Sequence, residues 1–175
     1  MLKTETDELL MAQVAQGNLD LLRILFDRHH LHIFNFLYKM CGDKMLSEDL
    51  TQDVFYKVIK YRSSYKNGKF VSWIFTIARN SLKTHFTRNK EMYSDLETVQ
   101  YRLVESDNES QENYSQLQRA LGKLESSDRE VLIMHRFYEI KYSELAEIMD
   151  STPGAIKTKV SRALKKLKTI YLESI

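Results

Sequence analysis

The chain has 175 residues, 43% of them hydrophobic, and a net charge of +2, which allows one domain or two small ones with buried cores. No apolar run approaches the ~20 residues of a membrane-spanning helix, and residues 1–16 lack the basic start and apolar centre of a signal peptide, so we expect a cytoplasmic protein without membrane insertion. The single cysteine, Cys41, excludes an internal disulfide framework and is typical of a reducing compartment.

The charge is distributed very unevenly along the chain. Residues 57–90 contain nine Lys or Arg and no acid, and residues 153–168 contain six Lys or Arg and no acid. Between them, residues 91–118 contain one basic residue and seven acidic ones. Two basic segments separated by an acidic one predict two distinct contacts with a polyanion.

One proline, five glycines and apolar residues at helical spacing almost everywhere predict an all-α protein. In the first half we expect helices at residues 7–16, 18–42, 47–62 and 70–89, with a loop at 63–69. Asn18 is expected to cap the second helix. A third helix that starts at Ser47 would hold Glu48 and Asp49 in its positively polarised first turn.

Apolar periodicity fades between residues 91 and 112, which predicts an acidic flexible linker. The linker divides the chain into a first helical domain, residues 1–90, and a second domain of four helices, residues 113–175. In the second domain Ser127 and Glu130 have capping-box spacing.

The end of the chain has the pattern of a helix-turn-helix. A short helix is expected at residues 142–149, followed by a tight turn at 150–152 and by a helix that Thr152 caps and Pro153 begins. The buried stripe expected on this last helix is Ile156, Val160, Ala163, Leu164 and Leu167. The polar face expected in a DNA major groove is Lys157, Thr158, Lys159, Ser161, Arg162 and Lys165. A basic amphipathic helix that only packs on its neighbours is the alternative.

Aromatic rings alternate with the cations of residues 57–90. They are Tyr61, Tyr65, Phe70, Trp73, Phe75 and Phe86. Cations neutralise phosphates and flat rings stack on bases, so this mixture is typical of a groove for unpaired nucleic acid. The alternative is a solvated basic face over an aromatic core, because Phe70, Trp73 and Ile77 also fall at helical spacing.

Six segments carry a resemblance to a known family. They are SEDLTQDVF at 47–55, FVSWIFTIARN at 70–80, LGKLE at 121–125, DREVL at 128–132, YSELAEIM at 142–149 and AIKTKVSR at 155–162. In this order, and across a charged linker, they resemble the extracytoplasmic-function group of bacterial RNA polymerase sigma factors over nearly the whole chain. The resemblance implies a non-enzymatic initiation factor without a cofactor or a metal.

The resemblance also implies partners and sites. Core RNA polymerase would bind the third helix through the clamp helices of its largest subunit, with Asp49, Gln52, Asp53 and Phe55 at the contact. The single-stranded −10 promoter element would meet Tyr65, Asn67, Lys69, Trp73, Asn80, Lys83 and Arg88, with Tyr65 and Asn67 at a flipped base. The helix-turn-helix would read the −35 element as duplex, and an anti-sigma factor would inhibit the protein.

Two other classes of function are open to such a chain. A metalloenzyme would need a ligand set, but adjacent histidines such as His29 and His30 point about 100° apart on a helix and His32 completes no recognised spacing. A conventional helix-turn-helix regulator would bind duplex DNA tightly without polymerase, whereas a sigma factor needs core enzyme.

Overall fold

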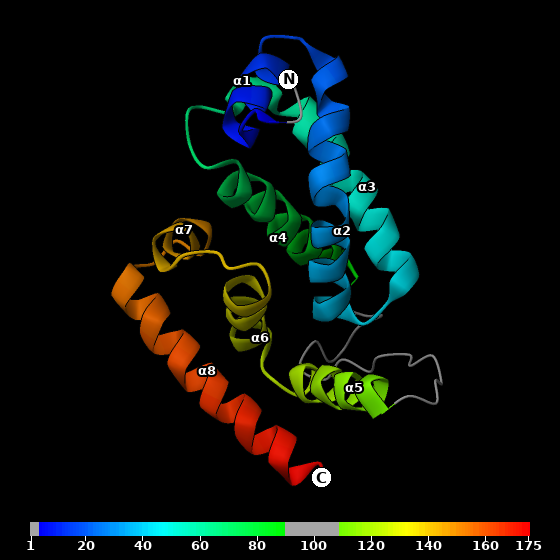
Figure 1. Cartoon of the computed structure of the whole chain (residues 1–175), viewed down its shortest axis with the longest axis vertical. Coiled ribbons are helices and arrows are strands. Elements are labelled where there is room, and N and C mark those ends of the chain that lie inside the picture. The colour runs from blue at the N-terminus through cyan, green and yellow to red at the C-terminus, as the bar shows by residue number, and fades with distance from the viewer. Residues whose placement is uncertain (1–3, 90–108) are drawn as a thin grey trace.

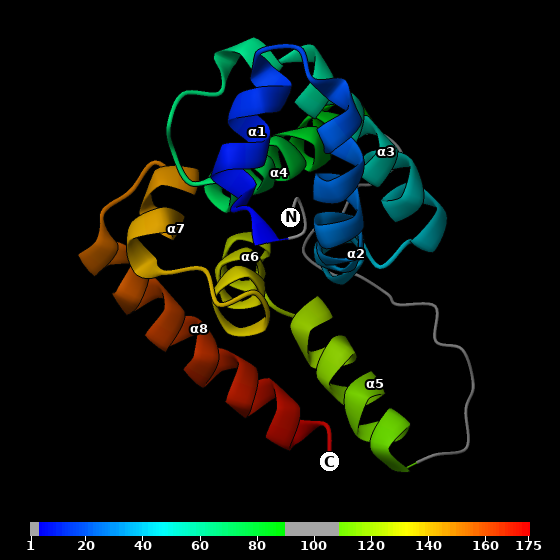
Figure 2. The same cartoon turned by 45° about the horizontal axis from the view of Figure 1, so that its top comes forward.

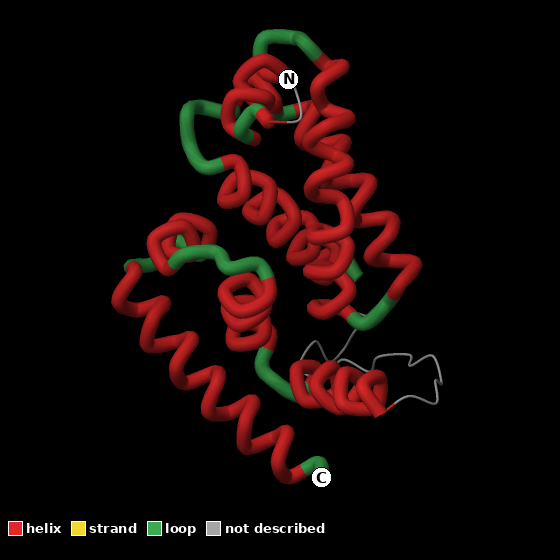
Figure 3. Tube along the Cα trace, viewed as in Figure 1, coloured by secondary structure: helices red, strands yellow, loops and turns green. Residues whose placement is uncertain are grey.

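The computed structural model describes residues 4–89 and 109–175, which form helices, turns and loops without any strand (Figure 3). The all-α prediction is confirmed. The first stretch contains α1 (Asp7–Ala15), η2 (Leu19–Leu21), α2 (Leu22–Cys41), α3 (Lys44–Lys60), η3 (Arg62–Ser64) and α4 (Phe70–Arg88). The second contains α5 (Glu109–Gly122), α6 (Ser126–Leu132), the π-helical turn η4 (Ile133–Phe137), α7 (Tyr142–Ile148) and α8 (Pro153–Glu173). None of the described helices has both the length and the apolar character required to traverse a bilayer.

Two helix starts in the first stretch differ from those predicted. Asn18 makes no capping bond with its side chain and precedes the 3₁₀ turn η2, so α2 begins only at Leu22. Helix α3 begins at Lys44 because the Asp43 carboxylate accepts a hydrogen bond from the Leu46 amide at 3.1 Å. Asp49 therefore lies in the second turn, beyond the first-turn amides that a carboxylate would complement.

The predicted capping box of the second half is wrong. Glu130 does not reach back to Ser127, because its carboxylate pairs with Arg79 of α4. Helix α5 starts at Glu109, so regular structure begins before the end of the predicted linker, and the linker prediction for residues 91–108 lies outside the described residues.

The helix-turn-helix is confirmed in detail. The Thr152 hydroxyl accepts a hydrogen bond from the Ala155 amide at 3.2 Å, and Pro153 occupies the first helical position. Asp150 provides the turn with a left-handed residue, φ 51°. This turn fixes the direction in which α8 leaves α7, and therefore the surface that α8 presents.

Helices α2, α3 and α4 pack around one apolar core, and α1 closes its end (Figure 2). Ile33, Phe36 and Phe70 are fully buried in this core, as are Leu10 and Val14 of α1. The buried faces follow the apolar periodicity of each helix. The outward face of α4 is mainly polar and basic, whereas that of α3 also carries acids and exposed apolar side chains.

The two described stretches contact each other through α4 and α7 and through the C-terminal end of α2 (Figure 1). The central residue at the second contact is Arg129 of α6, whose side chain is fully buried. Its guanidinium donates to the carbonyl oxygens of Leu121, Gly122, Leu124 and Met40 at 2.7–3.0 Å. Carbonyl groups at the C-terminal end of a helix have no hydrogen-bond donor within the helix. The Arg129 guanidinium provides donors for such carbonyls at the ends of both α5 and α2.

We expect Arg129→Met to lower the free energy of unfolding by about 3 kcal/mol or more, because four carbonyls lose a charged donor while remaining buried. Urea unfolding followed by circular dichroism measures this loss. Arg119→Met, at an exposed position in the same half, is the matched control and should stay within about 0.5 kcal/mol. Equal stability of the two variants would contradict the structural role given to Arg129.

Candidate nucleic-acid and polymerase interfaces

A groove of about 310 Å³ lies between the end of α3, η3 and α4. Its walls are Lys57, Tyr61, Ser64, Trp73, Ile77, Asn80, Ser81 and Thr84. Of the five α4 residues, Trp73, Ile77, Asn80 and Thr84 recur every three or four positions and Ser81 adjoins them, so one helical face forms the wall. The volume is at the lower end of the range for small-ligand sites.

The groove combines rings, amide and hydroxyl groups with one positive charge. The Lys57 ammonium donates to the Ser81 hydroxyl at 2.9 Å and pairs with Asp53 at 2.8 Å, which holds it at the edge of the groove. Tyr61 is 45% exposed. A flat base could stack in such a groove while its phosphate meets a cation.

Two of the residues predicted for the −10 element line this groove, namely Trp73 and Asn80. Asn67 and Lys69 are exposed in the preceding loop, and Asn67 adopts a left-handed conformation with φ 41°. The structure therefore brings Trp73 and Asn80 together in one groove and leaves Asn67 and Lys69 outside it, on the preceding loop.

Tyr65 is placed differently from the prediction. Its side chain is only 8% exposed, its hydroxyl donates to the Gly68 carbonyl, and its ring lies 5.3 Å from that of Trp73. Burial, together with the nearby charges of Glu8 and Asp7, raises the pKa of Tyr65 to about 12. Tyr65 therefore supports the loop from inside and offers no open ring to a base.

The two remaining −10 candidates lie on different sides of α4. Arg88 follows Thr84 by one turn and is exposed on the groove side, whereas the charge of Lys83 acts on Glu130 of the second half. The residues predicted individually for the −10 element did not include Lys57, Tyr61 or Ser64, although all three lie in the basic and aromatic segment 57–90. The available signal was the one-turn spacing of Lys57 and Tyr61 at the start of the acid-free segment.

The predicted polymerase face of α3 is only partly exposed. Asp49 and Gln52 face solvent and Asp53 is half-buried, but Phe55 is 6% exposed and packs edge-on against Phe26 with ring centroids 4.8 Å apart. Phe55 is thus a core residue and cannot serve as an apolar anchor for a partner.

Another pair of α3 residues has the exposure that Phe55 lacks. Met45 is 76% exposed and Tyr56 is 61% exposed. Positions 45, 49, 52 and 56 follow one another by four, three and four residues, so they share a face with Asp49 and Gln52. This face carries a carboxylate and an amide between two exposed apolar side chains.

Helix α8 presents the polar face that its sequence predicted. Lys157, Thr158, Ser161, Arg162 and Lys165 are exposed and Lys159 is half-buried, while Ile156, Val160 and Ala163 are buried. Leu164 departs from the predicted buried stripe: it is 36% exposed and, with Leu167 and Tyr171, lines an apolar groove against α5. On the polar side, the Lys166 ammonium is held by Asp128 at 2.7 Å.

Contacts between the halves involve charged and aromatic groups. Arg79 pairs with Glu130 and also donates to the Ile148 carbonyl. Burial raises the pKa of the Glu130 carboxyl above its ordinary value, although Arg79 acts in the opposite direction. The ring of Tyr138 lies 5.4 Å from that of Phe75, and its buried hydroxyl has no hydrogen-bond partner among the described residues.

The histidines considered as metal ligands have other partners. His29 Nε2 lies 2.7 Å from the Asp7 carboxylate, and His30 Nδ1 lies 2.7 Å from the Phe26 carbonyl oxygen. Within residues 4–89 and 109–175, no cluster of three or more His, Cys, Asp or Glu side chains could hold a metal ion.

Comparison with known proteins assigns both halves to one family. The family model "Sigma-70 region 2" matches residues 25–92, and "Sigma-70, region 4" matches residues 114–167. The chain is 27% identical over 143 residues to the ECF RNA polymerase sigma factor SigM of Bacillus subtilis. This alignment covers 79% of the chain and 88% of SigM.

Two solved structures have the same fold. The first is CnrH in complex with the cytosolic domain of CnrY, with a TM-score of 0.75 and 20% sequence identity. The superposition covers 97% of this chain and 99% of the matched chain. The second is the sigma factor RpoE in complex with the anti-sigma factor NepR from Bartonella quintana, with a TM-score of 0.70 and 21% sequence identity. The superposition covers 85% of this chain and 94% of the matched chain.

The matches to both sigma-70 regions, together with a helix-turn-helix whose last helix has a basic outer face, lead to one assignment: the chain belongs to the extracytoplasmic-function group of the sigma-70 family of RNA polymerase sigma factors.

Proposed function

We propose that this protein joins core RNA polymerase in the cytoplasm and holds a promoter at two places, the −10 element on residues 1–90 and the −35 element on residues 109–175. The observation that carries the proposal is the presence of two separate surfaces suited to nucleic acid, one on each half of the chain: the groove lined by Trp73 and Asn80, and the basic outer face of α8. RNA synthesis itself belongs to the polymerase, and sigma factors are not enzymes.

At the −10 element the groove between α3 and α4 would capture unpaired bases of one strand. Extruding a base costs a few kcal/mol of stacking, and the cost is recovered only if the base finds a ring and its phosphate a cation. Trp73 and Tyr61 supply rings, Asn80 supplies an amide for hydrogen bonds with a base edge, and Lys57 supplies charge. Arg88, one turn farther along, would hold the adjoining duplex.

At the −35 element α8 would enter the major groove. Arg162 can donate two hydrogen bonds to a guanine edge, and Thr158 and Ser161 lie on the same exposed face. Lys157, Lys159 and Lys165 add charge that favours phosphate contact. The buried residues Ile156 and Val160 hold the helix against α6 and α7 so that this face stays outward.

The polymerase contact would be the face of α3 formed by Met45, Asp49, Gln52 and Tyr56. An exposed ring beside a carboxylate is the combination that anchors interfaces and gives them charge specificity. The face lies on the side of α3 away from the buried Val54 and Val58, so a partner can reach it without disturbing the core.

Simultaneous binding of both elements requires the two halves to separate. A compact chain of 175 residues has a diameter of about 40 Å. Elements centred near positions −35 and −10 lie roughly 25 base pairs apart, about 85 Å at 3.4 Å per pair. We therefore propose that the pairing of Arg79 with Glu130 belongs to a closed resting form and breaks on the promoter.

We further propose that an anti-sigma factor binds this protein and stabilises the closed form. The RpoE complex with NepR motivates this partner, because that sigma factor has the same fold. An inhibitor bound across both halves would withhold the α3 face from polymerase and the groove from DNA at once.

The function is tested by transcription with purified core polymerase over a pool of genomic promoters. We expect defined start sites only when the protein is added, and Arg162→Ala should cost about 1–3 kcal/mol of discrimination at one −35 base. Lys123→Ala, which removes an exposed cation in the same half, should leave selectivity unchanged. Tight duplex binding without polymerase and no start sites would favour a conventional helix-turn-helix regulator.

For the polymerase face, Asp49→Ala combined with Tyr56→Ala should weaken core binding about tenfold or more, because an exposed anchor and its neighbouring charge are both lost. The measurement is competition for core polymerase, with circular dichroism to verify folding. Glu147→Ala, an exposed acid in the other half, is the control for a lost charge. Unchanged core affinity in the double variant would remove this face from the proposal.

For the closed form, Arg79→Glu should raise the radius of gyration above the about 16 Å of a compact chain of this length, because two carboxylates would then face each other. Small-angle X-ray scattering measures the change. The exchanged pair, Arg79→Glu with Glu130→Arg, should restore the smaller value. A single variant as compact as the original chain would show that this ion pair does not hold the halves together.

A further inference from the structure

Helix α4 begins without a capping side chain of its own. Its N-cap residue is Lys69, which makes no side-chain capping bond, and the surrounding segment contains no acid. The first amides of a helix have no helical acceptor and carry partial positive charge. In a segment as basic as residues 57–90, the start of α4 is therefore a concentration of positive charge that needs an acceptor from elsewhere.

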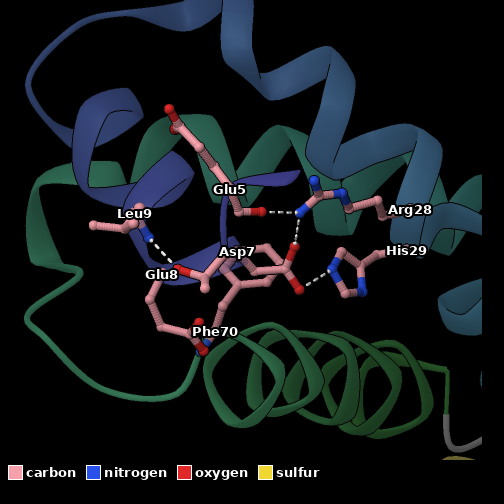
Figure 4. Close-up of polar contacts among 8 residues, drawn as sticks. Glu5, Asp7, Glu8, Leu9, Arg28, His29 and Phe70 are labelled. Carbon is pink, nitrogen blue, oxygen red and sulfur yellow. Dashed lines mark hydrogen bonds and ion pairs between the residues drawn. The ribbon is translucent and has the colours of Figure 1, made fainter. Parts of the chain in front are cut away.

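The acceptor is Glu8, 62 residues away in the sequence. Its Oε1 accepts a hydrogen bond from the Phe70 amide, the first amide of α4, at 3.1 Å. Figure 4 shows the Glu8 side chain reaching from α1 toward Phe70, while the neighbouring Asp7 points to Arg28 and His29. A carboxylate in this position satisfies an unpaired donor and complements the helix dipole.

Helix α1 is fixed in place, so Glu8 has little freedom to move away. Asp7 binds Arg28 at 2.8 Å and His29 at 2.7 Å on α2. Burial acts to raise the pKa of Asp7, but the hydrogen bonds and charges of His29 and Arg28 hold it below its ordinary value, so the carboxylate stays charged in this clamp. Leu10 and Val14 of α1 are fully buried against the core.

The loop before α4 is held by the same arrangement. The Tyr65 ring packs between those of Phe70 and Trp73, and its hydroxyl donates to the Gly68 carbonyl. The charges of Glu8 and Asp7 act on Tyr65. One carboxylate thus joins α1 to the amide that begins α4, directly beside a loop whose other end is packed on Trp73.

We propose that Glu8 is a positioning residue for capture of the −10 strand. It does not touch DNA, since a carboxylate there would repel phosphate, but it fixes the start of α4 and thereby the placement of Trp73 and Asn80 in the groove. The inference rests on the function proposed above, because it assigns Glu8 to the −10 surface only.

The test uses the full-length protein bound to core polymerase and two DNA probes, a single-stranded −10 oligonucleotide and a −35 duplex. Glu8→Ala should weaken binding of the −10 strand about tenfold and leave the −35 duplex unchanged. Glu8→Gln, which keeps an acceptor oxygen without the charge, should recover most of the loss. Asp20→Ala, at an exposed acid of the same half, should bind both probes normally.

Hydrogen exchange gives a direct second measurement. The Phe70 amide should exchange faster in Glu8→Ala than in the original chain, while the buried amides of α2 stay protected. Normal −10 binding in Glu8→Ala would overturn the inference, and so would an equal loss on both probes, which indicates general destabilisation. If the unaltered protein bound to core polymerase does not bind the −10 strand more tightly than an unrelated single strand, the proposed function fails instead.

Discussion

The structure depends on how a segment with nine cations and no acid is held in a folded protein. Like charges along residues 57–90 repel one another, so the compensating carboxylates must come from outside the segment. Three carboxylates supply this compensation. Glu8 accepts a hydrogen bond from the first amide of α4, Asp53 forms an ion pair with Lys57, and Glu130 forms an ion pair with Arg79. Glu8 and Glu130 bind sides of the segment that face protein, whereas Asp53 pairs with Lys57 at the edge of the groove. In the described part of the chain, Lys66, Lys69 and Arg88 have no ion-pair partner and remain available to a polyanion.

This arrangement gives the two sides of α4 different roles. One side carries Trp73 and Asn80 in the groove, and the other carries Arg79 against Glu130 and Ile148. Contact between the halves therefore leaves the groove open while it restricts the distance between the groove and the outer face of α8. The contact is also imperfect, because the buried Tyr138 hydroxyl has no hydrogen-bond partner among the described residues.

Individual residues show where reasoning from sequence reached its limit at the site. The outer face of α8 was predictable because helical periodicity places Arg162 and Lys165 opposite Ile156 and Val160. Phe55 and Tyr56 are adjacent and both aromatic, and a shift of one position decides which is buried. Tyr65 is an aromatic residue in a basic loop, as expected of a DNA contact. Its ring is nevertheless buried, and its hydroxyl donates a hydrogen bond to the Gly68 carbonyl.

The sequence by itself determined the helical class, the helix-turn-helix with its Thr152 cap and the two basic surfaces, because these follow from spacing and from charges close together in the chain. Only the tertiary structure decided that Glu8 caps α4, that Glu130 pairs with Arg79 and that Arg129 binds the Met40 carbonyl of α2. Such partners are 51 to 89 residues apart. No local pattern selects one carboxylate or carbonyl among many, since the choice depends on how whole helices pack.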